Sequence, residues 1–289
     1  MKFSLKKDKQ EKVLEPEFYK SFSGMPTMNY NVYYMKPMEK VLWFFIAFVV
    51  GALVGYLFYG GIGKDEFGQP TMLTYILDIT ISSVTGILAG TYYLPMRTKS
   101  IIAKRKQELV RQFRDMLDAL TTSLGAGKNV TDSFHSIYQD LKIQYEPDAY
   151  IIKELEVIIN DLASNFLIED ILEDFGKRSS NDDILSFARV FKVSYRKGGN
   201  FKDIIRNTHN VLSDKMEIRE EIETLLTANK LETTIMLFMP VVLVGIIKIM
   251  SPEFGANFVT PTGIISTTVS IGIFVGAYFL GRQILEIKA

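Results

Sequence analysis

The chain has 289 residues but no cysteine and only two histidines, His135 and His209. The absence of cysteine excludes disulfides, thiol nucleophiles and cysteine-ligated metals. Neither histidine has a neighbouring nucleophile or a metal-ligand spacing, so both are interpreted as structural. We expect no metal and no cofactor.

Motifs for catalysis and nucleotide binding are also missing. The sequence contains no phosphate-binding GxxxxGK[S/T] loop, no GxSxG elbow, no HExxH pair and no dinucleotide fingerprint. We therefore expect a protein that is not an enzyme and has no nucleotide motor of its own. The formal net charge is zero, which gives no reason to expect a nucleic-acid partner.

Charged side chains are nearly absent from four stretches of the chain. A helix needs roughly 20 mostly apolar residues to cross a bilayer. This criterion predicts four transmembrane helices, near 41–60, 72–94, 233–251 and 263–281. Asp78 and Lys248 are the only charged residues inside them.

The distribution of Lys and Arg predicts the orientation in the membrane. The first 40 residues, the segment 97–232 and the tail together carry 31 of the 33 basic residues. The two short connections, 61–71 and 252–262, carry only Lys64. Basic residues accumulate on the cytoplasmic side. We expect a multi-pass protein of the cytoplasmic (inner) cell membrane, with both termini and the large domain in the cytosol.

The segment between the second and third spans has the apolar period of helices. Phe113, Met116, Leu117, Leu120 and Leu124 share one helix face. Similar patterns predict six helices in an all-α protein. The expected organisation is an N-terminal cytosolic segment at 1–40, two spans within 41–95, a cytosolic helical domain at 96–232, two spans within 233–282 and a tail at 283–289.

Two parts of this domain resemble each other. GKNVTDSFHSIYQDL at 127–141 aligns without gaps on GGNFKDIIRNTHNVL at 198–212. Glycine is expected to end one helix, asparagine to cap the next, and aspartate to lie in its first turn. The match reflects either an inherited pseudo-repeat or a helix-turn-helix pattern of helix-ending and helix-capping residues that is used twice. The residues concerned are Gly125, Gly127, Asn129, Asp132, Gly198, Gly199, Asn200 and Asp203.

These motifs and the order of the spans resemble the type II secretion system F family. FRDMLDALTTSLGAGKNVTDSF (113–134), FARVFKVSYRKGGNFKDII (187–205) and a proline in the third span carry the resemblance. It covers roughly 95–250 and is nearest to the tight-adherence pilus branch, which has one F-type domain between two pairs of spans.

The resemblance implies a six-helix F-type bundle and a non-enzymatic platform for assembly of a pilus or secretion pseudopilus. Such a platform couples a cytosolic ATPase to the insertion of pilin-like subunits. The implied partners are that ATPase, pilin-like subunits, membrane lipids, and a second F-family protein or another copy of the chain.

Three residues within the spans are functional candidates. Asp78 and Lys248 are charges in the membrane, which are by default pairing or functional sites. We predict that they pair with each other or with a bound subunit. Lysine snorkelling is the alternative for Lys248, and a protonated or water-accessible carboxylate with no special role is the alternative for Asp78. Pro240 is either a hinge or a tolerated membrane proline. The pairs Gly51/Gly55 and Gly272/Gly276 have the spacing of close helix contacts.

The segment 140–174 contains ten acidic residues and two lysines. This pattern indicates either an ordinary solvated surface or a docking face for a basic partner such as the ATPase. A small-molecule transporter or a membrane signalling subunit remains an alternative function. Four spans leave little room for a substrate path, and no phosphoacceptor or catalytic module is visible.

Overall fold

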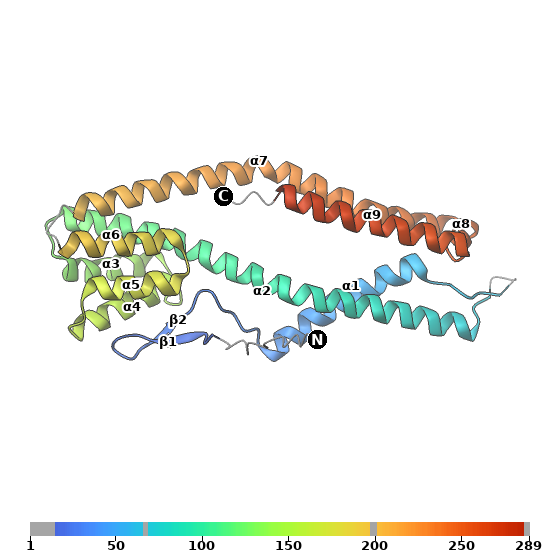
Figure 1. Ribbon diagram of the computed structural model, residues 1–289, viewed down its shortest axis with the longest axis horizontal. Helices are drawn as coiled ribbons and strands as arrows, with labels where there is room; N and C mark the ends of the chain where they lie inside the picture. Colours follow the sequence, from blue (N-terminus) through green and yellow to red (C-terminus); the bar gives the residue numbers. More distant parts are fainter. Residues whose placement is uncertain (1–14, 66–68, 197–200, 286–289) are drawn as a thin grey trace, which may run out of the picture. The chain divides into compact units, whose positions relative to one another are not determined.

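The computed structural model describes residues 15–65, 69–196 and 201–285. These residues are mostly helical, as predicted (Figure 1). The elements in order are β1 (Phe18–Lys20), β2 (Pro26–Met28), α1 (Pro37–Tyr59), α2 (Met72–Gly125), α3 (Val130–Gln144), α4 (Tyr150–Ala163), α5 (Ile168–Ser179), α6 (Asp182–Arg196), α7 (Phe201–Met250), α8 (Pro252–Asn257) and α9 (Pro261–Leu285).

Four helices contain segments that are long and apolar enough to cross a membrane. These are Pro37–Tyr59, a part of Met72–Gly125, Leu231–Met250 and Pro261–Leu280. Few of their side chains are buried within the protein, as expected of helices whose apolar surface faces lipid. The structure confirms the prediction of four helices that are long and apolar enough to cross a membrane.

The chain divides into two compact units. The first comprises Met1–Tyr34 and Ser100–Ser213, and the second comprises Met35–Lys99 and Asp214–Ala289. Both α2 and α7 contribute residues to both units. Leu212 is the last apolar residue of α7 that is buried among the residues whose burial is described, and the helix continues beyond it to Met250.

The core of the first unit lies where the apolar period predicts it. Phe113, Met116, Leu117, Leu120 and Leu124 are all at most 1% exposed. The ring of Phe113 packs against Phe175 of α5 and Phe187 of α6. Six helical segments surround this core within the described residues: the end of α2, all of α3 to α6, and the start of α7.

Local sequence explains how α5 and α6 pack closely. Ser180 ends α5 in the left-handed conformation (φ 47°), and the side chain of Asn181 accepts the backbone N–H groups of Asp183 and Ile184 at the start of α6. Gly176 faces α6 so closely that a Cβ there would lie 3.0 Å from the Cα of Leu185. Any larger residue at 176 would require α6 to shift by a few tenths of an ångström.

The N-terminal segment corrects the purely helical prediction. Residues 18–20 and 26–28 form an antiparallel two-stranded hairpin, in which Tyr19 pairs with Thr27. The hairpin belongs to the same compact unit as the helices between α2 and α7. Strands of three residues are too short to show a period-two pattern.

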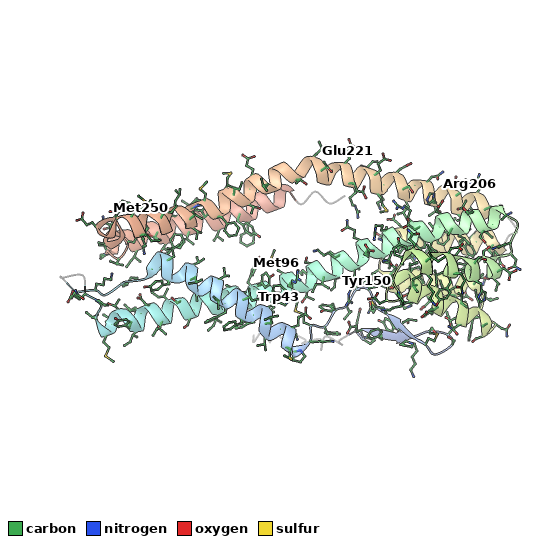
Figure 2. All side chains as sticks on the ribbon, turned by 180° about the vertical axis from the view of Figure 1, so that it is seen from behind. Trp43, Met96, Tyr150, Arg206, Glu221 and Met250 are labelled. Carbon is green, nitrogen blue, oxygen red and sulfur yellow. The ribbon has the colours of Figure 1, made fainter. Side chains whose placement is uncertain are left out.

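In the second unit, α1 and α2 pack through small residues. A Cβ on Gly51 would lie 2.5 Å from the Cβ of Ala89, and Gly55 meets the side chain of Thr85. Figure 2 labels Trp43 and Met96 at the other end of this pair, where the guanidinium of Arg97 lies 4.6 Å from the Trp43 ring. The first predicted glycine pair is therefore a helix contact. No described atom lies within 4 Å of a Cβ added at Gly272 or Gly276.

Candidate functional site

The loop between α2 and α3 has the predicted capping geometry. Gly127 has a φ of +87°, a conformation that favours glycine. Asn129 caps α3: its Oδ1 accepts the backbone N–H of Asp132 at 2.8 Å, and its Nδ2 donates to the Asp132 carboxylate at 2.7 Å. Gly125 is the last residue of α2. These four residues are exposed, so they lie on the surface of the first unit.

The second half of the internal match is described only in part. Gly198, Gly199 and Asn200 lie outside the described residues. Asp203 is in the first turn of α7, as Asp132 is in the first turn of α3. The aligned apolar residues behave alike, because Phe134 and Ile205 are fully buried and Leu141 and Leu212 nearly so.

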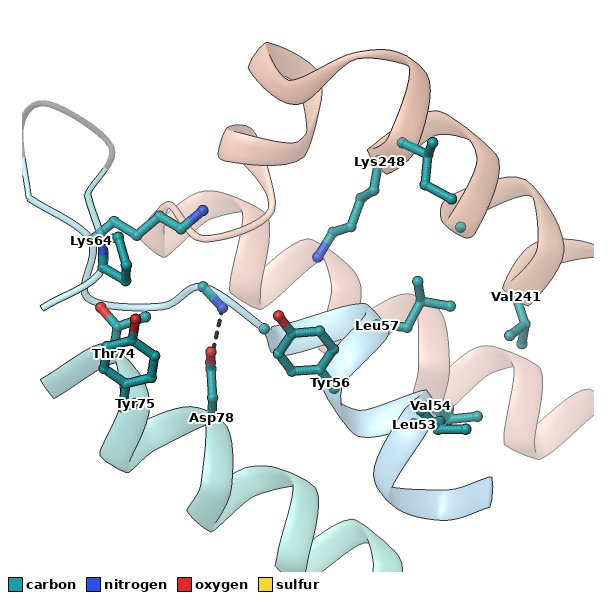
Figure 3. Close-up of a pocket in the computed structure, with 15 residues that line it drawn as sticks. Leu53, Val54, Tyr56, Leu57, Lys64, Thr74, Tyr75, Asp78, Val241 and Lys248 are labelled. Atoms are coloured by element: carbon teal, nitrogen blue, oxygen red, sulfur yellow. Dashed lines mark hydrogen bonds between the residues drawn. The ribbon is translucent and has the colours of Figure 1, made fainter. Parts of the chain in front are cut away.

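A cavity lies among α1, α2 and α7 in the second unit, next to the connection that follows α1 (Figure 3). Most of its surface is apolar, and it is called the polar cavity here for the charged and hydroxyl groups in its lining. It has a volume of about 680 Å³. Its polar lining comes from Tyr56, Lys64, Thr74, Tyr75, Asp78 and Lys248. The remaining lining is apolar and includes Leu53, Val54, Leu57, Val241 and Ile249. Both charged residues predicted inside the spans therefore line one cavity.

Asp78 and Lys248 do not form an ion pair with each other in the part of the chain that the structure describes. The Asp78 carboxylate instead accepts the backbone N–H of Gly61 at 2.9 Å. Gly61 has a φ of +95°, so this bond fixes the turn that follows α1. The ammonium of Lys248 lies 5.1 Å from the centre of the Phe258 ring, a cation–π contact. The other half of the prediction, a bound partner, stays a prediction.

Pro240 lies inside α7, and the helix continues through it. Because proline has no backbone N–H, the carbonyl of Met236 cannot receive its usual helical hydrogen bond. Pro240 also lines an apolar groove of about 580 Å³ formed by α1, α7 and α9. Val54 and Val241 line both this groove and the polar cavity, so the two spaces adjoin.

A buried charge cluster in the first unit was missed in the sequence. Arg178 of α5 donates two hydrogen bonds to the Glu154 carboxylate of α4, at 2.9 and 2.8 Å. Tyr30 donates to the same carboxylate at 2.9 Å. Burial and the neighbouring Glu154 carboxylate raise the pKa of Tyr30 well above its ordinary value. Glu154 lies on the same helix face as Ile151 and Ile158. A carboxylate on an apolar helix face was the feature from which the sequence could have predicted this buried cluster.

Arg178 also fastens the N-terminal segment to the helices. Its Nη1 donates to the carbonyl of Met28 at 3.3 Å, and its own carbonyl accepts the N–H of Tyr30 at 3.1 Å. Burial alone would lower the pKa of Arg178, but the carboxylates of Glu154 and Asp174 raise it above its ordinary value. The arginine is therefore charged at every physiological pH.

The acidic segment at 140–174 contributes fewer surface charges than its composition suggests. Glu154, Asp161 and Glu169 are buried, and Asp161 accepts hydrogen bonds from the Ser21 hydroxyl and the Ser23 backbone. On α5, Glu173 accepts from Lys177 and Lys192, which lowers its pKa to about 2. The exposed acidic residues without such a basic neighbour include Asp140, Glu146 and Asp148.

The described residues do not form a metal-ligand cluster of three or more His, Cys, Asp or Glu. His209 lies near three polar groups. The Ser213 hydroxyl at 3.5 Å and the Asp118 carboxylate at 3.9 Å face its Nε2, and the side-chain oxygen of Asn210 lies 3.4 Å from its Nδ1.

Comparisons with protein-family models, with curated proteins and with solved structures found no match for this chain. The fold itself defines a mostly helical protein whose four candidate membrane helices are those of a multi-pass membrane protein.

Proposed function

We propose that this chain is a non-enzymatic membrane platform for assembly of a pilus or a secretion pseudopilus. In this role it couples a cytosolic ATPase to the insertion of pilin-like subunits. The proposal places the chain in the cytoplasmic membrane, with both termini and the helical domain in the cytosol and the four candidate spans in the bilayer.

The observation that carries the proposal is the continuity of α2 and α7. Each helix joins a candidate membrane span to the buried core of the first unit, without a loop between them. An α-helix is a continuous hydrogen-bonded rod, so we expect a displacement at its cytosolic end to reach its membrane end. A platform that converts movement of a cytosolic motor into movement in the membrane needs such connections.

Two further features support the same function. The capped loop at 125–132 and the helix starting at Phe201 carry the motifs on which the resemblance to the type II secretion system F family rests. Asp140, Glu146 and Asp148 present exposed carboxylates at the end of α3 and in the loop after it, which suit a basic surface on an ATPase.

Deletion of the gene in the cell of origin tests this function. We expect the loss of surface filaments or of a secreted protein, with recovery when the full chain is supplied. Unchanged filaments and secretion, together with solute uptake by proteoliposomes that contain the purified chain, would favour a transporter.

A further inference from the structure

The polar cavity and the apolar groove of the second unit together have the polarity pattern of a phospholipid. The cavity contains two ammonium groups, from Lys64 and Lys248, and Figure 3 shows both pointing into it. The groove is lined mainly by apolar side chains of α1, α7 and α9, among them Phe58, Val244 and Phe274. Val54 and Val241 border both spaces, so one elongated ligand can occupy the two together.

The charges in the cavity favour an anionic ligand. Lys64 and Lys248 contribute two positive charges and Asp78 one negative charge. Asp78 is already hydrogen-bonded to the N–H of Gly61. Among the described residues, neither ammonium has a carboxylate within ion-pairing distance. Lys248 lies in a candidate span, where a cation normally pairs with a polar or charged group. Its ammonium contacts the Phe258 ring, and a phosphate between the two lysines would add a negatively charged partner.

The groove distinguishes a lipid from a free anion. Inorganic phosphate would leave about 580 Å³ of apolar space empty. An acyl chain is narrow and flexible, and contact with apolar side chains stabilises it in the groove. Tyr56, Tyr75 and Thr74 place hydroxyl groups in the cavity lining, where a headgroup offers hydrogen-bonding oxygens.

We propose that this site binds one anionic phospholipid from the leaflet that borders the two short connections. The phosphate lies between Lys64 and Lys248, and one acyl chain follows the groove past Pro240. The lipid thereby joins the connection after α1 to the end of α7. This proposal does not depend on the platform function.

Fluorescence quenching by brominated lipids tests the site in the full chain. The protein has one tryptophan, so Trp43→Phe combined with Phe58→Trp places the only indole in the groove. In nanodiscs, we expect brominated phosphatidylglycerol to quench this indole at lower mole fractions than brominated phosphatidylcholine. Replacing Lys64 and Lys248 by Gln should reduce that preference about fivefold per lysine.

The matched control is the pair Lys40→Gln and Lys99→Gln, which removes the same charge at the opposite ends of α1 and the membrane part of α2. This pair should leave the preference unchanged.

The proposal is overturned if phosphatidylglycerol is not preferred, or if the preference survives in the Lys64 and Lys248 variant. Displacement of the lipid by inorganic phosphate at constant ionic strength would identify a free-anion site instead. A stoichiometric single-span protein in the groove, found by mass spectrometry of nanodiscs formed from native membrane, would also overturn it.

Discussion

Arg178 and Glu154 form a two-point ion pair inside the first unit, with both side chains at most 5% exposed. The pair joins α5 to α4, and Tyr30 completes the hydrogen bonding of the carboxylate. Because the same arginine binds the carbonyl of Met28, the pair also anchors the β1–β2 hairpin. The N-terminal segment is thus an integral part of the helical unit.

Breaking this pair should destabilise the first unit strongly. Arg178→Met leaves the Glu154 carboxylate buried without its cation, at a cost of about 3–5 kcal/mol. Denaturant unfolding of the detergent-solubilised chain, followed by circular dichroism, measures the change. Arg189→Met on the exposed face of α6 is the control and should alter stability by less than about 0.5 kcal/mol. Equal stability of the two variants would refute the anchoring role.

Hydrogen exchange gives a local readout of the same anchor. The N–H of Tyr30 is bonded to the carbonyl of Arg178, so its protection depends on the contact between hairpin and helices. We expect Arg178→Met to increase exchange in 15–34 more than in α3. Uniform exchange across both segments would mean that the hairpin has no separate attachment.

The two glycine pairs should respond differently to enlargement. Gly51→Val forces a side chain against Ala89 and the backbone of Thr85, and overpacking of this kind costs about 1–3 kcal/mol. Gly272→Val is the control, because no described atom lies within 4 Å of its added Cβ. Thermal unfolding in detergent should show a lower midpoint for the first variant only. An equal drop in the unfolding midpoint of both variants would contradict the α1–α2 contact.

Removing the cap of α3 should lower the free energy of unfolding by a modest but measurable amount. Asn129→Ala removes the acceptor for the N–H of Asp132 and should cost about 1 kcal/mol. Thr131→Ala, on the exposed surface of the same turn, is the control. Denaturant unfolding of the two variants measures the difference. No difference would show that the loop does not depend on its cap.

Because of Tyr145, the stability of the first unit should depend on pH in the alkaline range. Partial burial and the hydrogen bond to Asp115 raise the pKa of Tyr145 from 10.0 to about 12. The folded chain therefore retains this proton more tightly than the unfolded chain. The stabilisation is complete below pH 10 and is lost as the pH rises towards about 12. Wild type should lose unfolding free energy in that window relative to Tyr145→Phe; parallel profiles would contradict the shift.

The sequence predicted the helices and their buried faces because these depend on local periodicity. The α2 face from Phe113 to Leu124 and the Asn129 cap follow from residues a few positions apart. The glycine pairs had the same spacing, yet only Gly51/Gly55 meets a neighbour. Spacing identifies a possible contact, whereas the partner helix decides whether it forms.

Long-range contacts could not be predicted in this way. Tyr30, Glu154 and Arg178 are far apart in the sequence, and no periodicity links them. The structure places Asp78 and Lys248 in the lining of one cavity, although the predicted ion pair between them is not formed among the described residues. The prediction did not anticipate that Gly61 would provide the hydrogen bond to Asp78, since that bond depends on the turn after α1.

Affinity purification after crosslinking in intact cells tests the platform function most directly. The tagged full-length chain is recovered in mild detergent, and its partners are identified by mass spectrometry. The account predicts a secretion-type ATPase and pilin-like subunits, with a second F-family protein or further copies of the chain. Recovery of the chain without any of these partners would contradict it.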